Sequence, residues 1–285
     1  MTALTHHTVL LDGLRIHFVK DGSGDPVYLL HGWPQDSHEW VRMVPLLREH
    51  YTVIAPDLRG MGYSGRPESG YDTRTLGQDV YRLSSALGHD SIHVVGHDFG
   101  ALAAYGLAAQ YPQRVRTLAA VEFLLPGLGV MEEWMQPKPG GNFIWHMAFH
   151  SVPDIPLALL QNREELYLRY FFSTFAYDPS AIGQNDIDHY VAALRQAGAL
   201  RASLELYKAW YASGDQVREL AHNPLTMPVL ALGGEACMGD MAKACFEKVA
   251  KHVSGGTVEK AGHWIPEEAP ERLAELLRTH FAAAG

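Results

Sequence analysis

The feature that most constrains this chain is a Gly-x-Asp-x-Gly turn between a strand-like run and a helix-like run. Residues 91–95 are rich in β-forming side chains, and an alanine-rich, helix-forming run begins within four residues of Gly96. A turn this tight holds its central residue, Asp98, in strained backbone geometry and leaves no room for side chains two positions away. Gly96 and Gly100 meet that requirement. The spacing is that of a nucleophile elbow, with a carboxylate where serine usually stands.

This turn is expected to expose the Asp98 carboxylate above the edge of a sheet, at the start of the following helix. The free amides and the dipole of that helix favour the ionised carboxylate. The alternative is an ordinary strand–helix junction in which Asp98 only caps the helix. The rest of the chain is needed to decide between these two interpretations.

Composition describes a water-soluble globular protein with an ample core. Of the 285 residues, 47% are hydrophobic and 19% are charged, and the formal net charge is −9. An acidic balance without a basic run argues against nucleic acid or an anionic membrane as partner. No apolar stretch of membrane-spanning length and no secretory leader is recognisable, so we expect a cytoplasmic protein.

Cysteine and histidine usage gives no sign of a disulfide framework or a metal centre. Cys237 and Cys245 lie in an expected loop–helix segment and are interpreted as reduced thiols. The 16 histidines form no His-Glu-x-x-His motif and no Cys/His cluster. We therefore expect no metal.

Eight strands are predicted, six of them in strand–helix alternation. The first two are joined by Asp12-Gly13, a strong hairpin signal. Most of the others are continuous apolar runs, as in strands that are buried on both faces of a parallel sheet. The predicted strands are residues 8–11, 14–19, 27–30, 52–55, 91–96, 117–121, 228–234 and 257–260. Helices are expected at 39–49, 73–87 with Thr73 as cap, and 270–281.

The pattern changes between the sixth and seventh strands, where about 95 residues are aromatic and helical. Helical stretches are predicted there at 164–172, 187–196 and 200–211. We expect an α/β protein with a core of residues 1–123 and 219–285, and a helical cap of residues 124–218 over the carboxyl ends of the strands.

The whole chain resembles the α/β-hydrolase fold, and within it the epoxide hydrolase and dehalogenase branch. The resemblance is strongest to the Cif-type epoxide hydrolases. The motifs that carry it are HGWP at 31–34, DLRGMGYS at 57–64, GHDFG at 96–100 and GHW at 262–264.

The resemblance implies a role for each of five residues. Asp98 would be the nucleophile and His263 the general base. Glu122, 24 residues after Asp98, would be the charge-relay acid that follows the sixth strand. His146 and Tyr207 match the two cap positions of the ring-opening pair.

The implied mechanism opens an epoxide to a vicinal diol through a hydroxyalkyl ester on the nucleophile, which a histidine-activated water then hydrolyses. The ring-opening pair would protonate the departing oxygen. The backbone N–H groups of Trp33 and Phe99 would form the oxyanion hole. The implied mechanism needs no cofactor. The partners implied are a small epoxide and water, and a homodimer is an open alternative.

Several of these assignments have competitors. Glu235 and Asp240 follow the seventh strand, where many hydrolases keep their acid, and could replace Glu122. His146 and Tyr207 lie in aromatic segments where core packing is common. The aromatic side chains of Trp33, Trp145 and Phe149 are expected to form an apolar substrate-binding wall.

Two other functions remain open. A dehalogenase shares the aspartate nucleophile, but fluoroacetate-cleaving members place arginines one and four residues after it, where this chain has Phe99 and Leu102. That argues against a haloacid substrate more than against a haloalkane. A protein of this fold that binds a ligand without turnover is the alternative from a different class.

Overall fold

The computed structural model describes residues 5–137 and 144–283, which contain one eight-stranded sheet. Its strand order is β1-β2-β4-β3-β5-β6-β7-β8. The strands are β1 (Thr5–Leu11), β2 (Leu14–Asp21), β3 (Asp25–Leu30), β4 (Tyr51–Pro56), β5 (Ile92–His97), β6 (Val115–Val121), β7 (Val229–Gly234) and β8 (Val253–Val258). The predicted α/β-hydrolase architecture is confirmed.

Strand direction follows from the connections. β2 is antiparallel to both of its neighbours, and strands β4, β3, β5, β6, β7 and β8 pair in parallel. Asp12 and Gly13 have positive φ values of 47° and 88°, the backbone that a tight hairpin requires. The parallel strands bring their carboxyl ends to one edge, where polar side chains from distant segments can meet.

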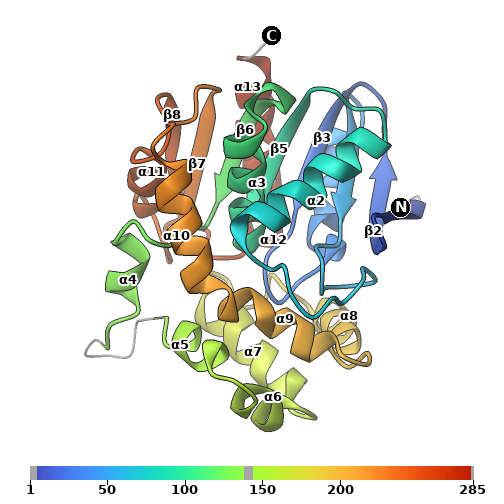
Figure 1. Ribbon diagram of the computed structural model, residues 1–285, viewed down its shortest axis with the longest axis vertical. Helices are drawn as coiled ribbons and strands as arrows, with labels where there is room; N and C mark the ends of the chain where they lie inside the picture. Colours follow the sequence, from blue (N-terminus) through green and yellow to red (C-terminus); the bar gives the residue numbers. More distant parts are fainter. Residues whose placement is uncertain (1–4, 138–143, 284–285) are drawn as a thin grey trace.

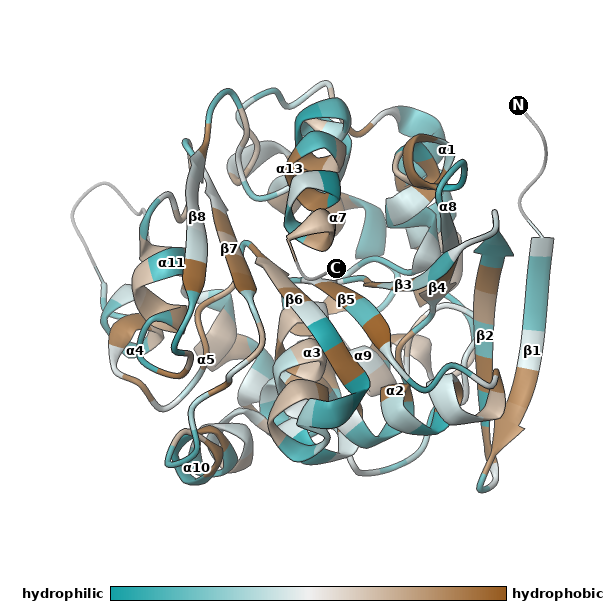
Figure 2. Cartoon of the chain, turned by 90° about the horizontal axis from the view of Figure 1, so that it is seen from above, coloured by the Kyte–Doolittle hydropathy of each residue, from teal (hydrophilic) through white to brown (hydrophobic). Residues whose placement is uncertain are grey.

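Helices cover both faces of the sheet (Figures 1 and 2). On one face, α1 (Val44–Leu47) and α13 (Pro270–Ala282) share an apolar cluster with the sheet. On the other face, α2 (Thr73–Ala86), α3 (Phe99–Gln110) and α11 (Met241–Phe246) do the same. Shorter pieces complete the core: η1 (Ser37–Arg42), η2 (Pro112–Arg114) and α12 (Ile265–Glu268).

Within the described residues, seven helices lie between β6 and β7, where the sequence predicts an inserted block. They are α4 (Val130–Trp134), α5 (His146–Ser151), α6 (Ile155–Leu160), α7 (Glu164–Thr174), α8 (Gln184–Leu194), α9 (Ala199–Lys208) and α10 (Trp210–Leu220). Figure 1 shows α5 to α9 as a layer beyond the carboxyl ends of the strands. The expected boundary at residue 218 falls inside α10, because this helix packs along α2 and continues to Leu220. Residues 138–143 of the expected cap, like residues 1–4 and 284–285 of the expected core, lie outside the described parts.

Three local predictions are wrong. The last strand was predicted at 257–260, but β8 runs from Val253 to Val258. It includes Gly255 and Gly256, whose φ values are 106° and 134°. The helix expected at 39–49 is η1 followed by α1, which begins at Val44 with a proline in its first turn. Asp72, not Thr73, caps α2 by accepting from the N–H of Thr75.

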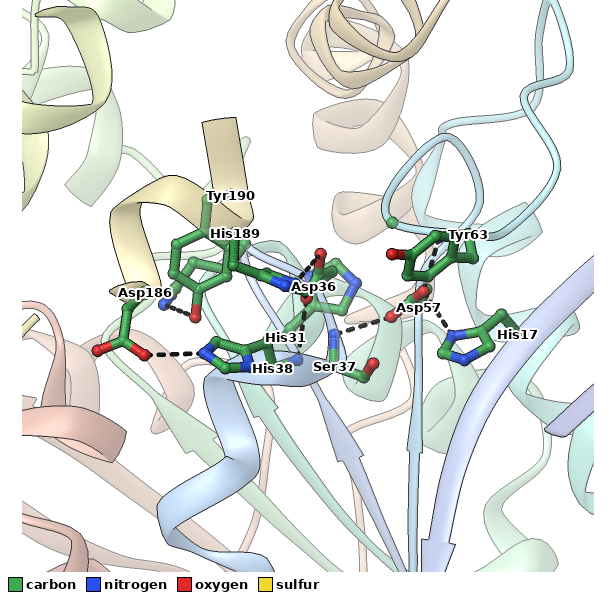
Figure 3. A network of polar contacts seen from close by, with 12 residues as sticks. His17, His31, Asp36, Ser37, His38, Asp57, Tyr63, Asp186, His189 and Tyr190 are labelled. Carbon is green, nitrogen blue, oxygen red and sulfur yellow. Dashed lines mark hydrogen bonds and ion pairs between the residues drawn. The ribbon is translucent and has the colours of Figure 1, made fainter. Parts of the chain in front are cut away.

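Paired histidines and carboxylates join α8 to the core (Figure 3). Nε2 of His189 lies 2.9 Å from both carboxylate oxygens of Asp36, and Nε2 of His38 lies 2.8 Å from Asp186. The rings of His38 and His189 stack at 4.3 Å. These contacts hold the inserted layer in register with the loop after β3. None of the helices in the described part of the chain is long and apolar enough to cross a membrane.

Candidate active site

Asp98 occupies the elbow that the sequence predicts. Its φ of 48° and ψ of −125° place it in a strained conformation between β5 and α3. A side chain at Gly96 would collide with the backbone of Gly100, and one at Gly100 would collide with the carbonyl of Leu30. Glycine at both positions is therefore a steric requirement of the turn, as predicted.

The elbow brings Asp98 to the imidazole of His263. His263 Nε2 lies 3.9 Å from Asp98 Oδ2, and His263 Nδ1 lies 3.0 Å from Oε2 of Glu122. The backbone N–H of His263 donates to the carbonyl of Phe175 at 2.7 Å, so the end of α7 fixes the histidine loop. A carboxylate, an imidazole and a second carboxylate thus form a continuous chain.

Glu122 is the acid that contacts this imidazole. It is fully buried directly after β6, at a φ of 50°, and its Oε1 accepts from the N–H groups of Gly234 and Met238 at 2.5 and 3.1 Å. The two rival acids are exposed and bonded elsewhere. Glu235 accepts from the Lys260 N–H, and Asp240 accepts from the Thr257 hydroxyl.

The loop after β3 supplies an amide to Asp98. The N–H of Trp33 donates to Asp98 Oδ1 at 2.9 Å, and Phe99 begins α3, where the first amides have no partner within the helix. Gly32 permits this approach, because a β-carbon there would lie 2.9 Å from Asp98 Oδ1 and closer still to Asp98 Cβ. This role of Gly32 was not predicted from the sequence, although the glycine lies inside the HGWP motif.

A narrow cavity of about 40 Å³ opens above Asp98 and His263. Its walls are mainly apolar and come from the core and from the inserted helices. Besides Asp98 and His263, the lining residues are Trp33, Phe99, Phe123, Met131, Trp134, Ile144, His146, Met147, Phe171, Phe175, Tyr207, Cys237, Met238 and Trp264. Water-poor surroundings of this kind strengthen electrostatic interactions between the polar groups that remain.

His146, the first residue of α5, and Tyr207, near the end of α9, both line this cavity, with ring centres 6.0 Å apart. Burial, followed by the nearby His263, lowers the pKa of His146 to about 3. Burial and the charge of Asp98 raise the pKa of Tyr207 well above its ordinary value. At neutral pH the imidazole is therefore neutral, and the phenol retains its proton.

Two expected wall residues lie behind the cavity. Among the described lining residues, neither Trp145 nor Phe149 is found, whereas Trp33 is. Trp145 stacks on Phe171 and donates to the hydroxyl of Tyr170 at 3.1 Å, because α5 turns His146 and Met147 inward instead.

A second histidine of α5, His150, packs against Tyr207 and was not among the predicted site residues. His150 lies one turn after His146, and its ring centre is 4.3 Å from that of Tyr207. Nε2 of His150 lies 2.7 Å from the hydroxyl of Tyr167. The spacing of four residues in His146–His150 is the signal that could have identified it.

A buried ion pair behind the site was also missed. Nδ1 of His97 lies 3.3 Å from Glu39 Oε1, and both side chains are inaccessible to solvent. Glu39 Oε2 accepts from the Gly32 N–H at 3.0 Å, and His97 Nε2 lies 2.8 Å from the carbonyl oxygen of His263. Burial acts to lower the pKa of His97, but Glu39 outweighs burial and raises it to about 9. This pair ties together the loops that carry Trp33, Asp98 and His263.

Known proteins are similar to this chain over most of its length. Residues 25–270 match the family model of the alpha/beta hydrolase fold. The chain is 40% identical to a soluble epoxide hydrolase of Corynebacterium sp. (strain C12), over 99% of this chain and 98% of that protein. It is 28% identical to a fluoroacetate dehalogenase of Burkholderia sp., over 93% and 84% of the two chains. The solved structure of the epoxide hydrolase CorEH without ligand superposes with a TM-score of 0.92, at 36% identity, covering 99% of this chain and 100% of the other.

Proposed function

The chain belongs to the α/β-hydrolase fold family, and from this premise we propose that it is an epoxide hydrolase, a hydrolase acting on ether bonds. The observation that carries the proposal is the chain Asp98–His263–Glu122 at the floor of an apolar cavity, with Tyr207 and His146 in the same walls. These groups supply a nucleophile, a base and proton donors without any other component.

In the first step, Asp98 attacks one carbon of the epoxide and the bond from that carbon to the ring oxygen breaks. Tyr207 and His146 donate hydrogen bonds to the ring oxygen, and a proton passes to the developing alkoxide. Both groups are uncharged donors at neutral pH, as their pKa shifts require. The product of this step is a hydroxyalkyl ester of Asp98.

In the second step, Nε2 of His263 removes a proton from water, which attacks the ester carbonyl carbon. Glu122 accepts from Nδ1 at 3.0 Å, which keeps the lone pair on Nε2 and stabilises the imidazolium that forms. The Trp33 N–H, already bonded to Asp98 Oδ1, and the Phe99 N–H stabilise the oxyanion. Collapse of this intermediate expels the diol oxygen, which takes the proton held by His263. Asp98 is left as the carboxylic acid, and its proton passes through solvent to the Tyr207 oxygen that gave one up in the first step.

The test separates the two steps. Asp98→Ala should abolish turnover, whereas His263→Gln should still form the ester but not hydrolyse it. Intact mass of the His263→Gln protein after mixing with an epoxide should show one adduct per chain, located on Asp98 by peptide mapping. Turnover that persists without Asp98, or an adduct on another residue, would rule out this mechanism.

A dehalogenase is the second candidate, because the fluoroacetate dehalogenase relative covers most of the chain. Phe99 and Leu102 are buried and apolar, so neither can pair with the carboxylate of a haloacid. Halide release from haloalkanes, with no turnover across varied epoxides, would favour this alternative. Tight binding of epoxides without any adduct would favour a non-catalytic binding protein.

A further inference from the structure

A thiol lies beside the histidine and the glutamate of the site and has no part in the proposed mechanism. Cys237 follows β7 in the loop whose amides hold Glu122, and it lines the cavity together with His263. Within residues 5–137 and 144–283, these side chains form the one group of three His, Cys, Asp or Glu residues whose ligand atoms lie close enough together to hold a metal ion. One ligand atom from each lies within 4.8 Å of the other two.

The three donors suit a soft or borderline divalent cation. Thiolate sulfur and imidazole nitrogen favour zinc-class ions over magnesium and calcium, which prefer oxygen. Three protein ligands leave the fourth tetrahedral position to water. Bonds of about 2.0–2.3 Å place ligand atoms roughly 3.5 Å apart, so a shift of about 1 Å would close the site around an ion.

The groups differ in how freely they can make that shift. Glu122 is buried and anchored through Oε1 by two amides, which leaves Oε2 directed at His263. Cys237 and His263 are partly exposed and face the cavity. The carboxylate of Glu122 can therefore act as the fixed ligand, and the side chains of Cys237 and His263 move toward it.

We propose that Glu122, Cys237 and His263 bind a thiophilic divalent cation of the zinc class, and that the bound ion arrests the enzyme as the ester of Asp98. The ion displaces the thiol proton, which passes to solvent, and takes the lone pair of His263 Nδ1, whose proton moves to Nε2. One proton is released for each ion bound. The thiolate and the carboxylate together neutralise the two positive charges.

The arrest follows from the change of tautomer. An imidazole that carries its proton on Nε2 cannot deprotonate water, so ester hydrolysis stops. Asp98 is not a ligand and lies 3.9 Å from Nε2, so its attack on the epoxide continues. This second half of the inference rests on the proposed function, and the first half does not.

The binding test uses cadmium chloride and the whole chain without any substrate. Cadmium–thiolate charge-transfer absorption should appear in the ultraviolet and saturate at one ion per chain. Cys245→Ser, which alters the other free thiol, is the matched control and should retain the signal, whereas Cys237→Ala should lose it. Affinity for cadmium should fall by at least about tenfold in Cys237→Ala, since loss of a direct ligand costs no less than loss of a supporting group. Circular dichroism should confirm that both variants are folded.

The arrest test adds an epoxide and follows intact mass. With cadmium, the parent protein should accumulate one ester per chain, and a chelator should release it. No thiolate signal, or a signal that survives in Cys237→Ala, would overturn the site. Equal slowing of ester formation and decay would refute arrest at the ester. Cadmium binding in a protein that never forms an ester would contradict the proposed function and leave the site standing.

Discussion

Replacing Gly32 by alanine tests how closely the loop after β3 must approach Asp98, the proposed nucleophile. The backbone φ of Gly32 is one that alanine adopts, so the obstacle is space alone. The new methyl would lie 2.9 Å from Oδ1 and 3.1 Å from Cγ of Asp98, and closer still to Cβ. An ordinary carbon–carbon separation of about 3.5 Å would require the loop and the elbow to part by roughly 1 Å.

That displacement would break the 2.9 Å bond from the Trp33 N–H to Asp98. Loss of one oxyanion donor costs about 10²- to 10³-fold in rate, and a 1 Å misplacement of reacting groups costs about as much. We therefore expect Gly32→Ala to lower kcat/KM for an epoxide by about 10²- to 10³-fold, with slower ester formation and slower ester decay.

The assay is single-turnover kinetics that resolves the formation and the decay of the ester. Gly183→Ala is the control, because a β-carbon there meets only Asp186 Oδ2 at 3.8 Å. Thermal unfolding of both variants should show whether the fold is retained. If folded Gly32→Ala forms and hydrolyses the ester at parental rates, close contact between this loop and Asp98 is not needed for catalysis.

Two further outcomes concern the site and one concerns the contact between α8 and the core. Tyr207→Phe should slow ester formation by about 10²- to 10⁴-fold and leave ester decay unchanged in the same single-turnover assay. If this variant forms the ester at the parental rate, Tyr207 is not a proton donor. Glu122→Gln should slow ester decay by about 10⁴-fold, because the amide favours the wrong tautomer, whereas Glu235→Gln should change it little; the reverse ranking would move the relay. Burial lowers the pKa of His189, but the hydrogen bond and charge of Asp36 outweigh it, so the folded-state pKa lies above 6.5. The resulting stabilisation is complete below pH 6.5 and is lost as pH rises through the folded-state pKa. In chemical denaturation, the stability difference between the parent and His189→Gln should shrink as pH rises above 6.5, and a constant difference would contradict this reasoning.

The sequence predicts those parts of the protein that local rules determine. The strained elbow at Asp98 needs small residues two positions away, and Gly96 and Gly100 are visible without a structure. The parallel strands can also be predicted from their apolar runs, because burial on both faces of the sheet requires apolar side chains. β8 was misplaced because its two glycines at positive φ carry no strand pattern.

Features that depend on contacts between distant segments could not be read in this way. Whether Trp145 or His146 faces the cavity depends on how α5 rests on α7 and α9, because consecutive residues of a helix point about 100° apart and contact different neighbours. Cys237 meets Glu122 only because the end of β7 lies beside the end of β6. Glu122 and Cys237 are far apart in the sequence, and no pattern near either residue predicts their contact.

The inserted helices α4 to α10 can change separately from the rest of the chain, because of where they join the sheet. They leave the sheet at the end of β6 and return at β7, its immediate neighbour, so the whole insertion is attached at two adjacent points. Asp98, Glu122 and His263 all precede or follow it, whereas His146 and Tyr207 lie within it. The inserted layer can therefore be reshaped as one block, while the residues that we propose to hydrolyse the ester stay in place. The restraint on such a change is that the reshaped layer must again offer a carbonyl to the His263 amide and a histidine to Asp36.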